Sequence, residues 1–190
     1  KMPKTEKEKR ALFCSFTKEA VIECRDMKSI YEVPHALEEQ KMADVILDML
    51  RVTEKKPDLK GWERLVEKIK NPKKTIKVAI AGKYTKLSDA YISVVESLKH
   101  AGYANDAAID IKWRNSEECL EEKRCKELLT DDQAFVVPGG FGVRGIEGNL
   151  NVIKYARESN LPFGGICRSM QCVGIEFARI VAGLKCADAV

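Results

Sequence analysis

The stretch that decides the fold is residues 76–102, IKVAIAGKYTKLSDAYISVVESLKHAG. Its first part contains VAIAG, a short apolar run that is typical of a buried strand. Its second part places Tyr91, Val94 and Leu98 on one side of a helix, and we expect Gly102 to end that helix in a left-handed conformation. A buried strand followed by an amphipathic helix is the first half of a βαβ unit.

The same alternation continues along the chain. The further strands and helices that we expect are, in order, 109–113 (strand), 117–129 (helix), 134–137 (strand), 149–159 (helix), 161–166 (strand) and 169–182 (helix). This pattern predicts an open parallel α/β sheet of Rossmann or flavodoxin-like type, with helices on both faces. In such sheets the active site lies at the carboxyl ends of the strands.

The residues before this sheet have a different character. The first 55 residues mix short apolar pieces such as ALFCSF with helix signals, and they do not provide a complete core. The next 20 residues are polar and contain one amphipathic helix, which suits an interdomain connector. The expected segments are therefore 1–55 (the end of a larger domain), 56–75 (a linker with a helix) and 76–190 (the sheet domain).

Composition excludes several classes of function. The 33 basic and 29 acidic residues are spread along the chain, so the net charge of +4 indicates no nucleic-acid surface. No apolar run approaches the roughly 20 residues that cross a bilayer, and we expect a cytoplasmic protein without a membrane segment. The seven cysteines are odd in number and form no CxxC pair, which indicates reduced thiols and no metal site.

Cys167 is the candidate nucleophile. It lies between the expected strand PFGGI and the expected final helix, in a turn of the kind that holds a nucleophile in a tight, strained conformation. Such a turn needs small residues two positions before and after the nucleophile, and Gly165 and Ser169 meet that need. The helix N-terminus favours the thiolate, the form that attacks carbonyl groups. The plainer alternative is a buried, unreactive thiol, but the glycine-flanked turn favours the nucleophile.

A second loop, PGGFGVRG over residues 138–145, follows the expected strand AFVV. The consecutive glycines Gly139 and Gly140 leave backbone amides free to donate to a tetrahedral oxyanion. Two other interpretations stay open. The spacing of residues 140, 142 and 145 matches the dinucleotide fingerprint GxGxxG, although the acidic residue of that fingerprint is lacking, and the loop is also consistent with a purely structural turn.

Histidine is scarce in this chain. A cysteine nucleophile normally needs a histidine base that a carboxylate orients. The two histidines are His35, in the first segment, and His100, at the end of the first helix of the sheet domain. Neither begins a His-x-Glu sequence, and we interpret both as surface or packing residues.

These residues together indicate a family. VPGGFGVRGIEG (137–148) and FGGICRSMQCVGIEFARIVAGLK (163–185), with VAIAGKYTKLSDAYISVVESLKHAG and IKWRNSEE before them, closely resemble the class I (triad) glutamine amidotransferase domain of the CTP synthase family. The stretches ALFCSFTKEAVIEC and SIYEVPHALEEQ are similar to the end of that family's synthetase domain. The resemblance covers nearly the entire chain.

The resemblance implies a reaction in two halves. Glutamine is hydrolysed through a cysteinyl thioester at Cys167, and the released ammonia aminates UTP to CTP after ATP, with Mg²⁺, has phosphorylated the UTP. For the complete enzyme it also implies GTP activation and a homotetramer. The implied oxyanion and glutamine-binding residues are Gly139, Gly140, Arg168, Ser169, Met170 and Gln171. Weaker matches imply a pyrimidine-nucleotide contact at Lys9 and an ATP-base contact at Arg25, Asp26 and Met27, for which plain surface positions are an equal alternative.

The chain also departs from the family pattern. The family's elbow reads Gly-x-Cys-Leu-Gly-Met-Gln, whereas this chain has Arg168 and Ser169 in the Leu and Gly places, and a serine Cβ there is expected to distort the tight turn. The family's catalytic histidine and glutamate, its phosphate-binding loop and its magnesium ligands have no counterpart here. We therefore expect a sheet that is incomplete at its C-terminal side and a polypeptide that alone neither makes CTP nor turns over glutamine. A binding or assembly module and a stand-alone cysteine hydrolase are the alternative interpretations.

Overall fold

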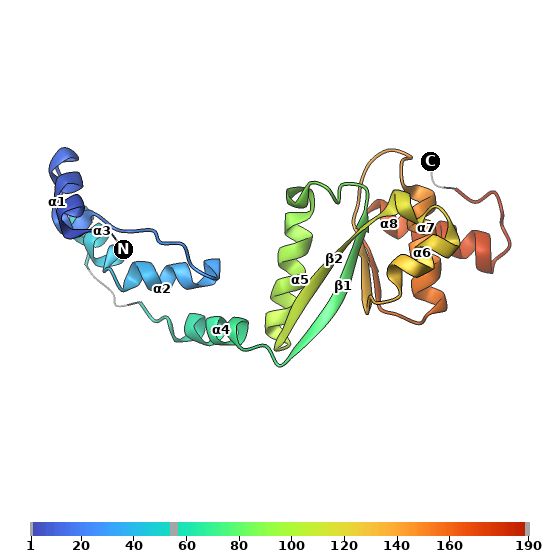
Figure 1. Cartoon of the computed structure of the whole chain (residues 1–190), viewed down its shortest axis with the longest axis horizontal. Helices are drawn as coiled ribbons and strands as arrows, with labels where there is room; N and C mark the ends of the chain where they lie inside the picture. Colours follow the sequence, from blue (N-terminus) through green and yellow to red (C-terminus); the bar gives the residue numbers. More distant parts are fainter. Residues whose placement is uncertain (1, 54–56, 189–190) are drawn as a thin grey trace. The chain divides into compact units, whose positions relative to one another are not determined.

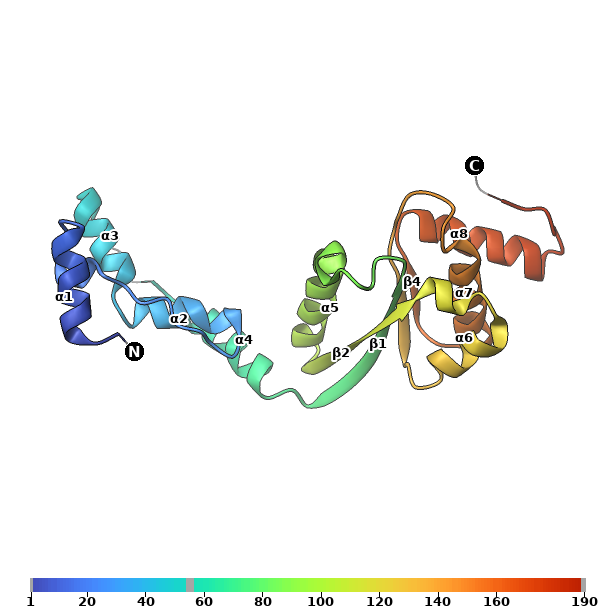
Figure 2. The same cartoon turned by 45° about the horizontal axis from the view of Figure 1, so that its top comes forward.

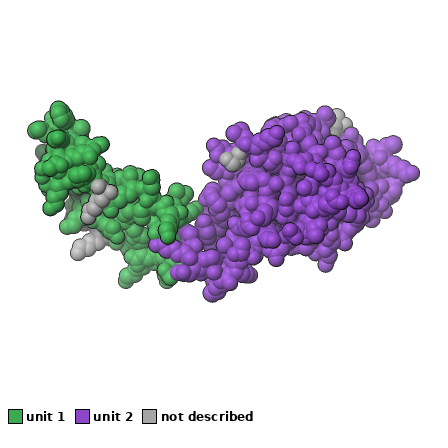
Figure 3. Space-filling model, viewed as in Figure 1, with its two compact units in different colours: residues 1–67 green, residues 68–190 purple. Residues whose placement is uncertain are grey.

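The computed structural model describes residues 2–53 and 57–188, which form two compact units, residues 1–67 and 68–190 (Figure 3). The predicted boundary at residues 55–56 lies outside the described residues, and the three-segment division stays a prediction. No helix among the described residues is both long and apolar enough to cross a membrane.

Unit 1 consists of short helices (Figure 1). They are α1 (Lys4–Phe13), α2 (Val33–Glu38), α3 (Met42–Leu50) and the first part of α4 (Lys60–Lys70), with single 3₁₀ turns at Lys18–Ala20 and Ile30–Glu32. Hydrogen bonds connect segments that are distant in sequence. The Gln40 side chain bonds both the N–H and the C=O of Glu23, at 2.8 and 2.9 Å, and the Trp62 indole donates to Tyr31 O at 2.7 Å.

Unit 2 is the predicted parallel α/β domain. Its strands are β1 (Lys74–Gly82), β2 (Ala107–Asn115), β3 (Ala134–Val137) and β4 (Phe163–Gly165), all parallel, in the order β2-β1-β3-β4. Its helices are α5 (Ile92–Ala104), α6 (Glu122–Leu129), α7 (Ile146–Glu158) and α8 (Arg168–Glu176), with 3₁₀ turns at Ser88–Tyr91 and Ser116–Cys119 and a π-helical turn at Phe177–Val181 after α8. This order confirms the fold class expected from the sequence.

The helices cover both faces of the sheet (Figures 1 and 2). Helix α5 packs against β2 on one side, while α6, α7 and α8 lie on the other. Right-handed crossovers explain this division. The step from β1 to β2 moves toward one edge of the sheet, whereas the steps from β2 to β3 and from β3 to β4 move toward the other edge, so their helices lie on opposite faces.

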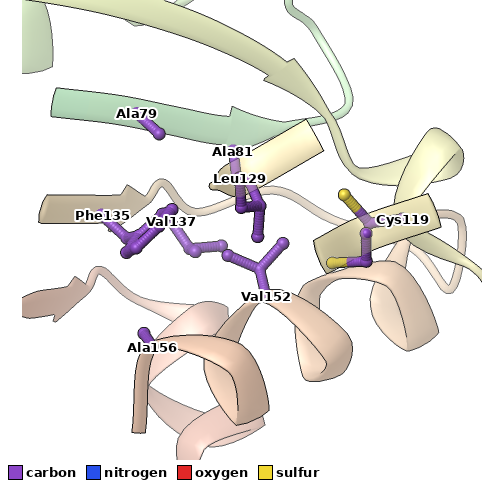
Figure 4. Close-up of a cluster of buried hydrophobic side chains, with 9 residues drawn as sticks. Ala79, Ala81, Cys119, Leu129, Phe135, Val137, Val152 and Ala156 are labelled. Carbon is purple, nitrogen blue, oxygen red and sulfur yellow. The ribbon is translucent and has the colours of Figure 1, made fainter. Parts of the chain in front are cut away.

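The main core of unit 2 lies between the sheet and the helices α6 and α7 (Figure 4). Phe135 and Val137 of β3 face Val152 and Ala156 of α7, and all four are buried. The Phe135 ring meets Tyr155 edge to face at 5.9 Å. A second cluster joins α7 to α8 through Leu150, Ile153, Cys172 and Ile175. Helix α8, which follows Cys167, is thus fixed to the core.

The expected helix stop at Gly102 is wrong. Helix α5 continues to Ala104, and the left-handed residue of this turn is Asp106, at φ 53°. Gly102 is instead a contact point, because a Cβ at this position would lie 2.6 Å from Ala107 O. The glycine lets the helix end approach the start of β2.

Candidate active site

Cys167 occupies a strained strand-to-helix turn. It lies between β4 and α8 with φ 56° and ψ −118°, a combination that L-residues rarely adopt. The turn is also tight, because a Cβ on Gly165 would lie 3.0 Å from Ser169 O. These two features are those of a nucleophile elbow, in which a side chain is held out at the carboxyl edge of a sheet.

The Cys167 thiol is exposed beside the glycine turn, residues 138–145. Strands β3 and β4 pair with Val137 opposite Gly165, and Ile166 N donates to Val137 O at 3.0 Å. The residues that follow the two strands therefore lie next to each other. A Cβ on Gly139 would lie only 3.0 Å from the Cβ and 3.6 Å from the Sγ of Cys167, so a bare backbone faces the sulfur.

Glycine is present at different positions in and after this turn for different structural reasons. Gly142 and Gly145 have φ values of 82° and 80°, and Gly145 precedes α7. A Cβ on Gly145 would lie 2.6 Å from Ser116 Oγ, and one on Gly148, in the first turn of α7, would lie 1.7 Å from Ser116 O. Backbone geometry and close packing account for these three. Gly139, by contrast, is the glycine that approaches the thiol.

A cleft of about 470 Å³ opens over the thiol, within the range of about 300–1,000 Å³ that is usual for small-molecule sites. Its lining residues are Gly139, Gly140, Phe141, Cys167, Arg168 and Gln171. The structure thus brings Gly139, Gly140, Arg168 and Gln171, all expected from the sequence, to the same cleft as Cys167.

Ser169 and Met170, the other two residues of that expected group, are placed differently. Met170 is exposed but does not line this cleft. Ser169 is only 2% exposed, and its hydroxyl donates to Pro138 O at 2.7 Å. The Ser169 side chain therefore contacts the glycine turn and does not line the cleft.

Lys83 is a residue that sequence reasoning missed. It directly follows β1, and its ammonium group donates to Phe141 O in the glycine turn. Its Cε would lie 3.0 Å from a Cβ on Gly140, so Lys83 packs tightly against the glycine turn. The available signal was its place at the end of β1, at the same sheet edge as the two predicted loops.

Two tyrosines support this corner of the site. The Tyr84 ring lies 5.3 Å from the Lys83 ammonium and 5.8 Å from the Arg144 guanidinium, distances at which cations interact with an aromatic face. Tyr91 is packed beneath them, and its OH accepts from Tyr84 N at 3.4 Å. Burial raises the pKa of the Tyr91 phenol, which keeps it neutral. The cationic groups that contact this pair of tyrosines are Lys83 and Arg144.

The histidine of unit 2, His100, is not placed beside Cys167 by its helix. His100 lies in the last turns of α5, which runs antiparallel to the strands, and therefore toward their amino ends. Cys167 lies at the carboxyl ends. His35 belongs to α2 in unit 1.

The four residues that were weakly matched to nucleotide contacts lie in unit 1, and all are exposed. Lys9 is in α1, while Arg25, Asp26 and Met27 follow in an irregular segment. Arg25 pairs with Glu23 at 2.7 Å, and this contact raises the pKa of the guanidinium. A nucleotide role for these residues stays a prediction.

Comparison with known proteins relates the chain to one family. The model of the class-I glutamine amidotransferase family matches residues 86–188, and that of the CTP synthase N-terminus matches residues 1–52. The chain is 50% identical over 184 residues to the CTP synthase of Geobacillus kaustophilus, covering 97% of this chain and 34% of the relative. It is 51% identical over 187 residues to that of Caldanaerobacter subterraneus, covering 98% and 35%.

The structural comparison agrees. The chain resembles the Trypanosoma brucei CTPS glutaminase domain with bound acivicin, with a TM-score of 0.56 and 34% identity, over 60% of this chain and 44% of that one. The chain spans about a third of the length of the curated relatives that it matches. It belongs to the class-I glutamine amidotransferase family, and its homology to CTP synthase extends over nearly all of its 190 residues.

Proposed function

We propose that this chain carries the glutamine-hydrolysing site of a CTP synthase, with Cys167 as the nucleophile. The observation that supports this most is the position of an exposed thiol, on a left-handed elbow, within 3.6 Å of the Cβ position of Gly139. This juxtaposition provides a nucleophile and unobstructed backbone donors in one cleft.

In the proposed reaction, the Cys167 thiolate attacks the carboxamide carbon of glutamine, and the carbonyl π electrons move to the oxygen. The resulting oxyanion accepts hydrogen bonds from backbone N–H groups of the glycine turn and from the N–H of Arg168, the residue after the nucleophile. The tetrahedral intermediate collapses as the protonated amine leaves as ammonia, which forms a thioester. Water then attacks the thioester carbon, releases glutamate and restores the thiol.

Arg168 and Gln171 line the cleft, and we propose that they hold the charged end of the glutamine substrate. Arginine presents a planar set of donors that matches a carboxylate. Met170 and Ser169 belong to the same stretch of α8, but Ser169 acts from the buried side. The cleft is thus lined mainly by the glycine turn and the first turn of α8.

The proton transfers need a general base, and unit 2 contains one histidine, His100, which lies on α5. We therefore propose that the 190-residue polypeptide alone forms covalent adducts at Cys167 but does not turn over glutamine. Loss of triad members costs activity by about 10⁴-fold or more in well-studied hydrolases.

For the complete enzyme we propose transfer of the ammonia to UTP that ATP has activated, with activation by GTP, assembly as a homotetramer and a cytoplasmic location. Lys9 and the stretch 25–27 are the proposed nucleotide contacts of this chain. The described residues contain no group of three or more His, Cys, Asp or Glu side chains that could hold a metal ion.

Covalent labelling tests the proposal. A chloroketone analogue of glutamine is expected to alkylate Cys167 selectively, whereas iodoacetamide is expected to label all four exposed thiols, which are Cys14, Cys24, Cys167 and Cys186. The buried thiols Cys119, Cys125 and Cys172 should react only after unfolding. Burial raises the pKa of Cys172, and the hydrogen bond with Cys119 together with burial raises that of Cys125.

The measurement is peptide mass spectrometry of the native protein, with Cys167→Ser as the control. Excess L-glutamine should protect Cys167 from the chloroketone but leave the other exposed thiols unprotected. Equal chloroketone labelling of Cys14, Cys24 and Cys186 would contradict the proposal and would favour a binding module without a glutamine pocket.

A further inference from the structure

We infer that the buried hydroxyl of Ser169 is a positioning residue that sets the orientation of the Gly139 peptide. This inference rests on the proposed function, because it assigns a role within the oxyanion site. Ser169 lies two residues after Cys167, where the family's elbow has glycine. The structure shows a specific hydrogen bond of the serine hydroxyl, so the serine side chain is not merely accommodated at this position.

The contact is buried at both ends. Ser169 is 2% exposed, Pro138 is also buried, and Ser169 Oγ donates to Pro138 O at 2.7 Å. The backbone of Ser169 is fixed as well, because its N–H donates to Ile166 O at 3.1 Å. The hydroxyl therefore connects the rigid first turn of α8 to the first residue of the glycine turn, 31 positions earlier in the chain.

Peptide geometry transmits this contact to Gly139. Pro138 C=O and Gly139 N–H belong to one peptide unit, and in a planar trans peptide they point in opposite directions. The described chain contains no cis peptide bond. With the carbonyl directed inward to Ser169, the Gly139 N–H is directed away from Ser169, on the part of the turn that lies closest to Cys167.

Gly139 needs such a restraint. Glycine has a wide range of backbone conformations, and a sequence of two glycines rotates its peptide planes easily. Rotation of the 138–139 peptide would remove the acceptor from the Ser169 hydroxyl, and an unpaired hydroxyl in a residue that is 2% exposed costs free energy. The serine therefore favours one peptide orientation before any ligand binds, as a preorganised oxyanion site requires.

The test compares two reactions at the same sulfur. In both, the thiolate forms a C–S bond and a halide leaves. The chloroketone analogue of glutamine places its ketone oxygen where the oxyanion donors act, whereas iodoacetamide has no recognised side chain and reports thiol reactivity alone. The ratio of the two rates at Cys167 therefore reports the effect of the oxyanion donors separately from any change in the reactivity of the thiol.

Ser169→Ala and Ser169→Gly are the variants, and Ser116→Ala is the matched control, since Ser116 is also fully buried and its hydroxyl has no hydrogen-bond partner among the described residues. We expect both Ser169 variants to lower the rate ratio about fivefold to tenfold, less than the roughly 100-fold or larger effect of deleting an oxyanion donor outright. The loss should appear in the maximal inactivation rate and not in the half-saturating chloroketone concentration, and Ser116→Ala should leave the ratio unchanged.

Three outcomes are distinguishable. An unchanged ratio in folded Ser169→Ala or Ser169→Gly protein overturns the inference while the proposed function stands. An equal loss in Ser116→Ala also overturns it, because the effect would then follow general packing. If the chloroketone shows no preference for Cys167 in the unsubstituted chain, the proposed function itself fails, and the inference fails with it.

Discussion

Unit 1 and unit 2 differ in how much of their apolar surface lies inside them. Among the described residues of unit 1, the buried apolar residues are Ala11 and Val66. Most of those of unit 2 form two clusters, one between the sheet and the helices α6 and α7 and one that joins α7 to α8. Large side chains such as Phe13 and Leu50 in unit 1 are mostly exposed. A short helix depends for its stability on tertiary burial of its apolar face, so the helices of unit 1 should be less stable than those of unit 2.

The largest expected effect uses one phenylalanine from each unit. Phe135 is 1% exposed and Phe13 is 86% exposed. Phe135→Ala should lower the free energy of unfolding of unit 2 by about 3–5 kcal/mol, because it removes a buried ring and leaves a cavity. Phe13→Ala should change that of unit 1 by less than about 0.5 kcal/mol.

Urea titration followed by tryptophan fluorescence measures this pair, because each unit contains one tryptophan, Trp62 in unit 1 and Trp113 in unit 2. Trp113→Phe and Trp62→Phe backgrounds report the two units separately. A comparable loss for the two alanine variants would remove the contrast between the units.

An intermediate effect is expected for two arginine–glutamate pairs of equal length. Arg157–Glu176 in unit 2 and Arg10–Glu6 in unit 1 are both 2.7 Å long, but the Glu176 side chain is 2% exposed and that of Glu6 is 47% exposed. Glu176→Gln should destabilise unit 2 by about 2 kcal/mol, below the about 3–5 kcal/mol of a fully buried pair, because Arg157 keeps solvent access. Glu6→Gln should cost less than about 0.5 kcal/mol.

Thermal unfolding at low and high salt checks this second contrast. The Glu176 effect should persist in 1 M NaCl, which screens exposed charges far more than buried ones. A salt-sensitive Glu176 effect would show that this pair is an ordinary surface contact.

The smallest expected effect concerns a carboxylate that is held by two lysines. Asp106 in unit 2 contacts Lys73 and Lys68 at 2.8 and 2.9 Å, and these hydrogen bonds lower its pKa from 3.8 to about 2. Glu8 in unit 1 contacts Lys18, and that contact also lowers its pKa. A depressed pKa in the folded state means that the stabilisation is present above the unfolded value and is lost as the pH falls.

The melting-temperature difference between the unsubstituted chain and Asp106→Asn should therefore be constant above pH 5 and should shrink as the pH falls from 3.8 toward about 2. In a Lys68→Met, Lys73→Met background, Asp106→Asn should have no pH-dependent effect. A difference that stays constant down to the acid limit would mean that the lysines do not hold the carboxylate in solution.

The sequence predicted the parts of unit 2 that repeat a local pattern. The run VAIAG is buried in β1, Phe135 and Val137 of AFVV are buried in β3, and the cysteine between PFGGI and the final helix is the elbow residue. Apolar periodicity and glycine placement within about ten residues predict these elements, so a single sequence is sufficient to predict them.

The contacts that the sequence did not reveal connect residues that are far apart in the chain. Gly102 resembled a local helix stop, but it is small because Ala107 O approaches it. Lys83 reaches Phe141 O across 58 positions, and the Ser169 hydroxyl finds Pro138 O across 31. The pairing of β3 with β4 brings this acceptor within reach of Ser169, while the distortion expected from a serine Cβ stays a prediction.

The backbone conformation of Cys167 lowers the stability of the fold at the position of the proposed nucleophile. An L-residue held at φ 56° and ψ −118° costs on the order of 1–3 kcal/mol, a substantial share of the about 5–15 kcal/mol by which domains are usually stable. Glycine adopts this conformation without steric strain, so selection for thermal stability alone would favour glycine over cysteine at this position. The cysteine therefore makes the fold less stable than a glycine would, and what it adds at this position is an exposed thiol, which we propose as the nucleophile.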